Sequence, residues 1–132
     1  MAEQDLKLAH QSYVAWNRGD VDWLLDHLTE DVEVQPLREI EEFEDVYRGR
    51  ESWMRFWEAW QEVWPGVAIK VHRLEDMGDH GVLALLSFDR DAGDLGQSSV
   101  PNSHWLSFRD GKICSVIAMA PETAERRREA RG

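Results

Sequence analysis

The stretch Ser52-Trp53-Met54-Arg55-Phe56-Trp57-Glu58-Ala59-Trp60-Gln61-Glu62-Val63-Trp64 decides the fold, because four of the chain's seven tryptophans lie in it. The four tryptophans follow the i, i+4, i+7, i+11 spacing of one helix face: Trp53, Trp57, Trp60 and Trp64. Phe56 lies on the same arc, and the charged residues lie elsewhere. This spacing predicts a helix with a broad aromatic wall. In a chain of 132 residues, either ordinary core or a pocket must cover that wall.

Length and charge restrict the function classes. We expect a single domain over residues 1–132, because the chain is long enough to bury a core without disulfides or metals. The net charge of −11 argues against nucleic acid or an anionic membrane as a partner, since both need clustered basic side chains. The first residues, Met1-Ala2-Glu3-Gln4-Asp5, are polar and lack a basic start followed by an apolar run, so we expect neither a signal peptide nor a spanning segment and a cytoplasmic protein.

The order of elements predicts an α+β fold. Helical spacing comes first, and the apolar period then changes from 3.6 to 2. The expected helices and strands, in chain order, are an N-terminal helix ending at Asn17, a helix over Val21–Leu28, a strand over Asp31–Gln35, the tryptophan helix, strands over Val67–Met77, Val82–Asp89, Val100–Phe108 and Ile113–Ala120, and a short charged helix from Pro121. The acidic segment Arg38–Val46 is expected to be a long loop that borders a pocket mouth.

Two strands are apolar on both faces, namely the runs Val82–Leu86 and Ile113–Ala120. An antiparallel sheet with one wet face would alternate apolar and polar residues. We therefore expect the helices to cover one face of the sheet and a second subunit to cover the other, which predicts a homodimer.

Four short motifs in this order resemble the SnoaL-like branch of the nuclear transport factor 2-like superfamily. They are Ala15-Trp16-Asn17-Arg18-Gly19-Asp20, Glu30-Asp31-Val32-Glu33-Val34, Tyr47-Arg48-Gly49-Arg50-Glu51 and His104-Trp105-Leu106-Ser107-Phe108-Arg109-Asp110-Gly111-Lys112-Ile113. The resemblance implies a cone, in which a curved antiparallel sheet wraps around a long helix and leaves a hydrophobic pocket. Members include polyketide cyclases, ketosteroid isomerase, limonene epoxide hydrolase and proteins without known activity, so the fold alone does not fix the function.

The functional positions of ketosteroid isomerase are only partly matched. That enzyme uses an aspartate base and an oxyanion hole of a tyrosine and a protonated aspartate. By the resemblance, the base falls at Pro36, which cannot accept a proton. The tyrosine falls at Ser12, next to Tyr13, and the oxyanion-hole acid falls at His104. Steroid isomerisation by that mechanism is not expected.

His104 is the candidate catalytic residue, because strand period places it inward with Leu106. Its imidazole can act as a general acid or base near neutral pH, with Tyr13 or Trp57 as a hydrogen-bond donor. A core histidine bonded to a neighbour is an equally good interpretation. The candidate ligand-binding residues are Tyr13, Trp16, Val34, Trp53, Phe56, Trp57 and Leu106.

Two functional hypotheses remain open. The first is a cofactor-free enzyme of cyclase, isomerase or hydratase type that acts on a small hydrophobic or polyketide-like molecule. The second is a ligand-binding or accessory dimer without chemistry, which Pro36 favours. A purely structural dimerisation module is a weaker third. The histidines lack close metal-ligand spacing and the chain lacks a phosphate loop or dinucleotide fingerprint, so neither a metal nor a cofactor is expected.

Overall fold

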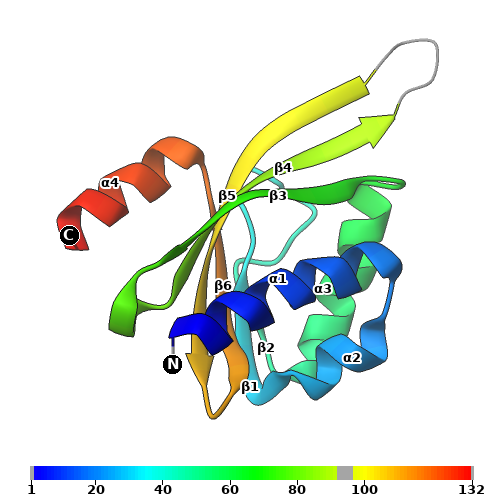
Figure 1. The fold of residues 1–132 in the computed structure, drawn as a ribbon. Coiled ribbons are helices and arrows are strands. Elements are labelled where there is room, and N and C mark those ends of the chain that lie inside the picture. The colour runs from blue at the N-terminus through cyan, green and yellow to red at the C-terminus, as the bar shows by residue number, and fades with distance from the viewer. Residues whose placement is uncertain (1, 92–96, 132) are drawn as a thin grey trace.

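The computed structural model describes residues 2–91 and 97–131, and it consists of helices on both sides of one six-stranded sheet. In chain order the elements are α1 (Ala2–Arg18), α2 (Val21–Asp26), β1 (Leu28–Gln35), β2 (Tyr47–Arg48), α3 (Arg50–Val63), β3 (Ala68–Asp76), the 3-10 turn η1 (Gly78–His80), β4 (Val82–Asp91), β5 (Gln97–Arg109), β6 (Lys112–Met119) and α4 (Pro121–Arg131). The expected α+β class is confirmed. Figure 1 shows α1, α2 and α3 on one side of the sheet and α4 on the other.

The sheet is mixed, with strand order β2-β1-β6-β5-β4-β3. Strands β3 to β6 form an antiparallel meander, as expected. The expectation of a wholly antiparallel sheet is wrong at one pair, because β1 runs parallel to β6 from the pairing of Leu28 with Ile113 onward. After β1 the chain forms α3 and the strands β3, β4 and β5 before β6 pairs with β1. Such a long connection permits parallel pairing.

The tryptophan helix α3 packs its aromatic side against the curved sheet. Trp53 and Trp60 are each only 3% exposed, and Trp57 and Trp64 are partly buried against the same core. Gly49 precedes the helix with a positive φ of 86°, a conformation that glycine adopts without strain. The helix ends at Val63, just before Pro65-Gly66. The prediction that this helix lies against the concave face of the sheet is confirmed.

The second helix is shorter than the expected Val21–Leu28. It ends at Asp26, where the backbone N–H of His27 bonds to the carbonyls of the last turn. Strand β1 then begins at Leu28, earlier than the expected Asp31, because Leu28 and Thr29 are buried. The polar sequence Thr29-Glu30-Asp31 does not favour a strand, but the burial of Leu28 and Thr29 outweighs this low strand propensity.

The C-terminal helix α4 covers part of the outer face of the sheet. Leu83, Trp105 and Met119 form a second core with Ala124 of this helix. Arg128 adds an ion pair to Glu75 at 2.8 Å. This helix covers, within the chain, some of the apolar residues that suggest a second subunit. Leu85 and Ile117 remain only partly buried beside the second core.

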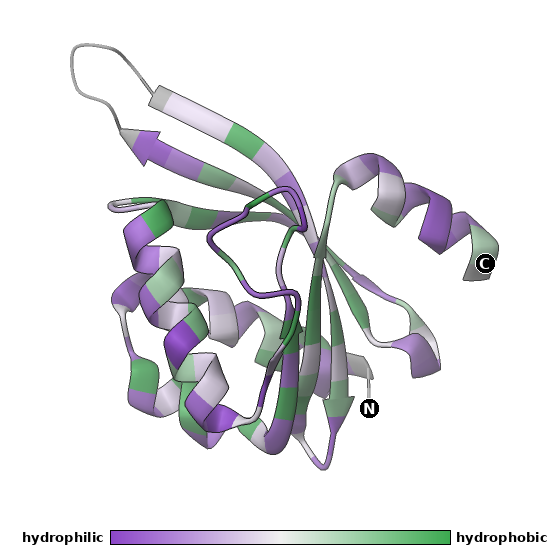
Figure 2. Cartoon of the chain, turned by 180° about the vertical axis from the view of Figure 1, so that it is seen from behind, coloured by the Kyte–Doolittle hydropathy of each residue, from purple (hydrophilic) through white to green (hydrophobic). Residues whose placement is uncertain are grey.

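The acidic segment between β1 and β2 is irregular, as expected. Figure 2 shows it as a mostly hydrophilic loop running between α3 and the sheet. Phe43 anchors it: the residue is 9% exposed, and its ring centroid lies 5.5 Å from that of Phe56. None of the described helices is long and apolar enough to cross a membrane.

Candidate functional site

A narrow cavity of about 70 Å³ lies between the helices and the concave face of the sheet. Its walls come from α1, α2, α3 and four of the strands. The lining residues are Ser12, Tyr13, Trp16, Leu24, Leu28, Val34, Gln35, Pro36, Trp53, Phe56, Trp60, Ile69, His104, Leu106, Ile113, Val116 and Ala118. No Asp, Glu, Lys or Arg stands among them, so the cavity favours uncharged contents.

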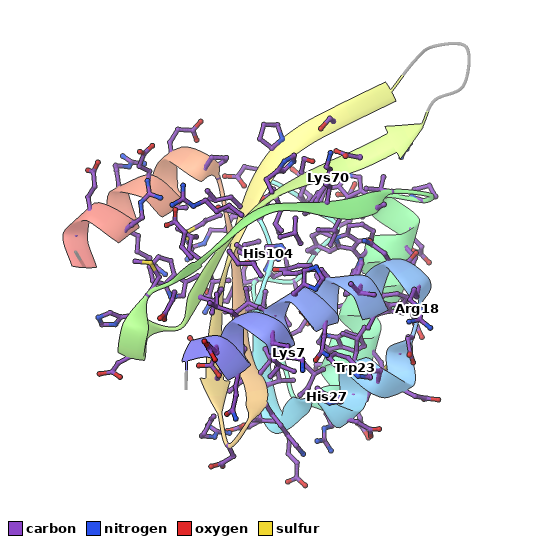
Figure 3. All side chains as sticks on the ribbon, in the orientation of Figure 1. Lys7, Arg18, Trp23, His27, Lys70 and His104 are labelled. Carbon is purple, nitrogen blue, oxygen red and sulfur yellow. The ribbon has the colours of Figure 1, made fainter. Side chains whose placement is uncertain are left out.

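Tyr13 of α1 and His104 of β5 meet at the cavity wall. The Tyr13 hydroxyl oxygen lies 2.8 Å from Nδ1 of His104, and the two rings stack with their centroids 5.8 Å apart. The Phe88 ring makes an edge contact with the imidazole, with the two ring centroids 6.1 Å apart. Figure 3 shows His104 between the sheet and α1. The pair is therefore held by one hydrogen bond and by aromatic packing.

The electrostatics of this pair follow from burial. Burial lowers the pKa of His104 to about 4, since a charged imidazole would lose its hydration. Burial also raises the pKa of the Tyr13 phenol above its ordinary range. At neutral pH both groups are therefore uncharged, and the Tyr13 hydroxyl keeps a proton that it can donate.

This protonation assigns the tautomer of His104. If the Tyr13 O–H donates to Nδ1, the proton of the neutral imidazole must sit on Nε2. The opposite arrangement would leave the Tyr13 O–H without an acceptor among the described residues. Within the same part of the chain, no group is hydrogen-bonded to Nε2. The pair therefore presents an N–H donor that is free to bind an oxygen of a ligand.

The indole of Trp16 fills the centre of the aromatic wall. Its ring centroid lies 4.5 Å from Trp57, 5.1 Å from Trp60, 5.9 Å from Phe56 and 6.1 Å from Trp53. Its Nε1 is buried and has no hydrogen-bond partner among the described residues. Such a donor is uncommon in a folded interior.

Seven of the eight residues proposed from the sequence line the cavity: Tyr13, Trp16, Val34, Trp53, Phe56, His104 and Leu106. Trp57 does not, and it instead lines a surface groove on the far side of Trp16. The segment Arg38–Val46 contributes no lining residue either, so its expected place at the pocket mouth is not observed.

Sequence reasoning missed several parts of the wall. Trp60 shares the helical stripe with the candidate residues but is not among them, yet it is both buried and part of the lining. Pro36 and Gln35 line the cavity beside it. Both residues lie at the end of the alternating strand β1, and this position is the sequence feature that could have indicated their place at the cavity. Ser12 lines the cavity too, although its hydroxyl donates to the carbonyl of Ala9 at 2.6 Å and is not free for a ligand.

A metal site is not found in the part of the chain that the structure describes, where no three His, Cys, Asp or Glu side chains converge. Cys114 is a free, half-buried thiol, and burial raises its pKa. It lies on β6 in an outer groove with Asp31 and Arg109. It is therefore separate from the Tyr13–His104 pair.

Comparisons with known proteins agree with this geometry. The SnoaL-like domain profile matches residues 9–116. No curated protein matches the chain. Among solved structures, TerC co-crystallised with polyporic acid is 16% identical, with a TM-score of 0.76, over 94% of this chain and 96% of that one. An NTF2-like protein of unknown function from Burkholderia pseudomallei is 15% identical, with a TM-score of 0.75, over 94% and 95%.

A third structure is SalBIII, an epoxide hydrolase/cyclase-like enzyme with a role in pyran ring formation in the polyether salinomycin. It is 19% identical, with a TM-score of 0.70, over 92% of this chain and 94% of that one. At such identities these likenesses establish the fold and leave the chemistry open. The family match, by contrast, spans most of the chain and includes the cavity residues from Ser12 to Val116. The chain therefore belongs to the SnoaL-like domain family.

Proposed function

We propose that this protein is a cytoplasmic, cofactor-free homodimer that binds a small uncharged hydrophobic molecule, of polyketide-like type, through one of its oxygen atoms. In this proposal the Nε2–H of His104 donates to a carbonyl or ether oxygen and polarises it. The reaction class is cyclisation, isomerisation or hydration. Tyr13 holds the imidazole in the tautomer that donates.

The single observation that carries this proposal is the Tyr13–His104 hydrogen bond at the wall of an apolar cavity. An imidazole whose pKa is about 4 is a weak base at neutral pH, so a role as general base is disfavoured. A neutral imidazole can still stabilise negative charge that develops on an oxygen, as the neutral histidine of triosephosphate isomerase does. In a water-poor cavity such a donor acts more strongly than in water.

The structural neighbours are consistent with the proposed reaction class, but their low sequence identity means that the proposal does not rest on them. SalBIII is an epoxide hydrolase/cyclase-like enzyme, and TerC crystallised with polyporic acid. Both have the fold found here, with 19% and 16% identity. The homodimer rests on the partly buried Leu85 and Ile117 of the outer face, which α4 leaves incompletely covered.

A panel of uncharged aromatic and alicyclic ketones and epoxides tests the proposal. Binding and turnover are compared for the wild type, His104→Gln and Tyr13→Phe, with His10→Gln as the matched control at an exposed position on α1. If His104 polarises the substrate, His104→Gln lowers kcat/KM about 100-fold, and Tyr13→Phe lowers it less. Equal turnover in His104→Gln and His10→Gln contradicts the proposed role.

A second function, ligand binding without chemistry, is favoured by Pro36. It lines the cavity where ketosteroid isomerase carries its base, and no carboxylate lines the cavity in its place. In that case the panel would show ligands whose affinity falls in His104→Gln and which the protein never converts. Product analysis by mass spectrometry after long incubation separates the two functions.

A further inference from the structure

We propose that Trp16 is a movable plug, which leaves its place among the aromatic side chains to admit a planar, uncharged aromatic ketone from the surface groove beside it. The inference rests on the proposed function, because it presumes that the cavity takes a ligand. It adds the class of ligand and the route by which the ligand reaches His104.

The cavity as it stands is too small for such a ligand. Its volume is about 70 Å³, whereas a cavity of roughly 150 Å³ holds benzene and typical ligand pockets begin at about 300 Å³. Some side chain of the wall must therefore move before a ring can bind. Trp16 is the largest side chain of α1 in that wall, and four aromatic rings surround its indole.

The hydrogen bonding of Trp16 favours it as the side chain that moves. Its Nε1 has no hydrogen-bond partner in the described part of the chain although the atom is buried. A buried donor without a partner raises the free energy of the closed state, and exposure to water would restore its hydrogen bond. By contrast, the Tyr13 hydroxyl on the preceding turn is bonded to His104. Of these two aromatic side chains of α1, Tyr13 is therefore held by a hydrogen bond and Trp16 is not.

There is space for the indole on its outer side. Trp16 lines the inner cavity and also a surface groove of about 380 Å³, which is bordered by Gly19, Trp57 and Gly66. A Cβ placed on either glycine would meet no atom within 4 Å, so the groove walls are not crowded there. Trp16 as a whole residue is only half-buried. An outward rotation would join the groove to the cavity.

The space that Trp16 would leave favours a flat, uncharged ligand. Trp53, Trp57 and Trp60 present faces and edges that suit another flat ring, since aromatic pairs prefer the edge-to-face geometry seen around Trp16. No charged side chain lines the cavity, which disfavours an ionised ligand. His104 offers its N–H in the same cavity, so an oxygen on the ring completes the fit.

The test uses the full-length wild type labelled with 5-fluorotryptophan, with the Trp16 resonance assigned from Trp16→Phe. The probes are 2-acetylnaphthalene, naphthalene and the non-planar cyclohexyl methyl ketone. On addition of 2-acetylnaphthalene we expect the Trp16 resonance alone to gain the solvent isotope shift of an exposed indole. Trp23, on α2 and outside the cavity lining, is the internal control and should not change.

Affinity gives an independent measurement. Removal of the plug in Trp16→Ala should tighten 2-acetylnaphthalene binding about tenfold, because the closed population no longer competes with the ligand. Trp16→Leu serves the same purpose if the alanine variant does not fold. The wild-type association rate should also level off at high probe concentration, at the rate of plug opening.

The outcomes separate the plug from the proposed function. If 2-acetylnaphthalene binds in a His104-dependent way while Trp16 stays buried, the plug is refuted and the proposed function stands. If naphthalene and 2-acetylnaphthalene displace Trp16 equally well and His104→Gln binds both unchanged, the plug stands, whereas the role of His104 and the preference for a ketone are refuted. Preference for cyclohexyl methyl ketone, or no binding of any probe to the wild type, overturns the plug and its ligand class.

Discussion

The low pKa of His104 predicts a specific loss of stability in mild acid. The perturbation is a fall from about pH 7.5 to about pH 5. In the unfolded chain the imidazole takes up a proton near its ordinary pKa of 6.5, whereas in the folded protein its pKa is about 4. Between these values the unfolded state binds more protons, so the free energy of unfolding falls as the pH falls.

The size of the effect follows from the two pKa values. Their separation, from 6.5 to about 4, at about 1.4 kcal/mol for each pH unit, limits the total to about 3 kcal/mol. About 2 kcal/mol of this should already be lost at about pH 5. That is a large part of the ~5–15 kcal/mol by which single domains are stable.

Urea unfolding at a series of pH values measures it. Other groups also titrate in this range, because the chain holds 26 acidic residues. The comparison is therefore between the wild type and His104→Gln, which keeps hydrogen bonding but does not titrate. The wild type should lose about 2 kcal/mol more than the variant over this range. Parallel curves for the two proteins would refute the argument that His104 is neutral and buried in the folded state, whereas His10→Gln should follow the wild type.

Three further outcomes are expected. Gly81→Ala should destabilise the protein by about 3 kcal/mol or more in urea unfolding, because its Cβ would lie 2.0 Å from the carbonyl oxygen of Leu106 and its φ is +103°. Gly78→Ala, where no atom lies within 4 Å of the added Cβ although φ is +63°, is the control and should cost less. Asn17→Ala should cost about 1–3 kcal/mol, since its side chain bonds both the N–H and the carbonyl of Ile69, at 2.8 and 2.7 Å; an unchanged midpoint would contradict this. Light scattering at micromolar concentration should give the mass of a dimer, and a monomer mass would remove that proposal.

Much of the fold could be predicted because its signals are local. The tryptophan spacing determined α3, and alternation placed His104 on the same strand face as Leu106, where the structure has both at the cavity. The turn Asp110-Gly111 between β5 and β6 has a positive φ at both residues, which is the conformation that an Asp-Gly pair favours in a two-residue hairpin. Each of these features depends on neighbours within a few residues.

What could not be predicted depends on contacts between distant segments. The docking of α4 gave little sequence signal, because Ala124 is the one buried side chain that the described part of this helix adds to the second core, and most of the helix is charged. Trp57 and Trp60 belong to the same helical stripe and both pack against Trp16, yet of the two only Trp60 lines the cavity. Cavity volume depends on rotamers across several elements, and no local pattern encodes them.

The parallel pairing of β1 with β6 has a consequence for how the chain folds during synthesis. Strand β6 is the last in the sequence, but it lies between β1 and β5 in the sheet. Until the ribosome has released it, β1 has only the two residues of β2 as a partner. The cavity is also incomplete, because Ile113, Val116 and Ala118 of β6 form one of its walls. Folding is therefore governed by contacts of long sequence separation, which form slowly, and a chain that stalls before residue 112 would expose an unpaired strand edge prone to aggregation.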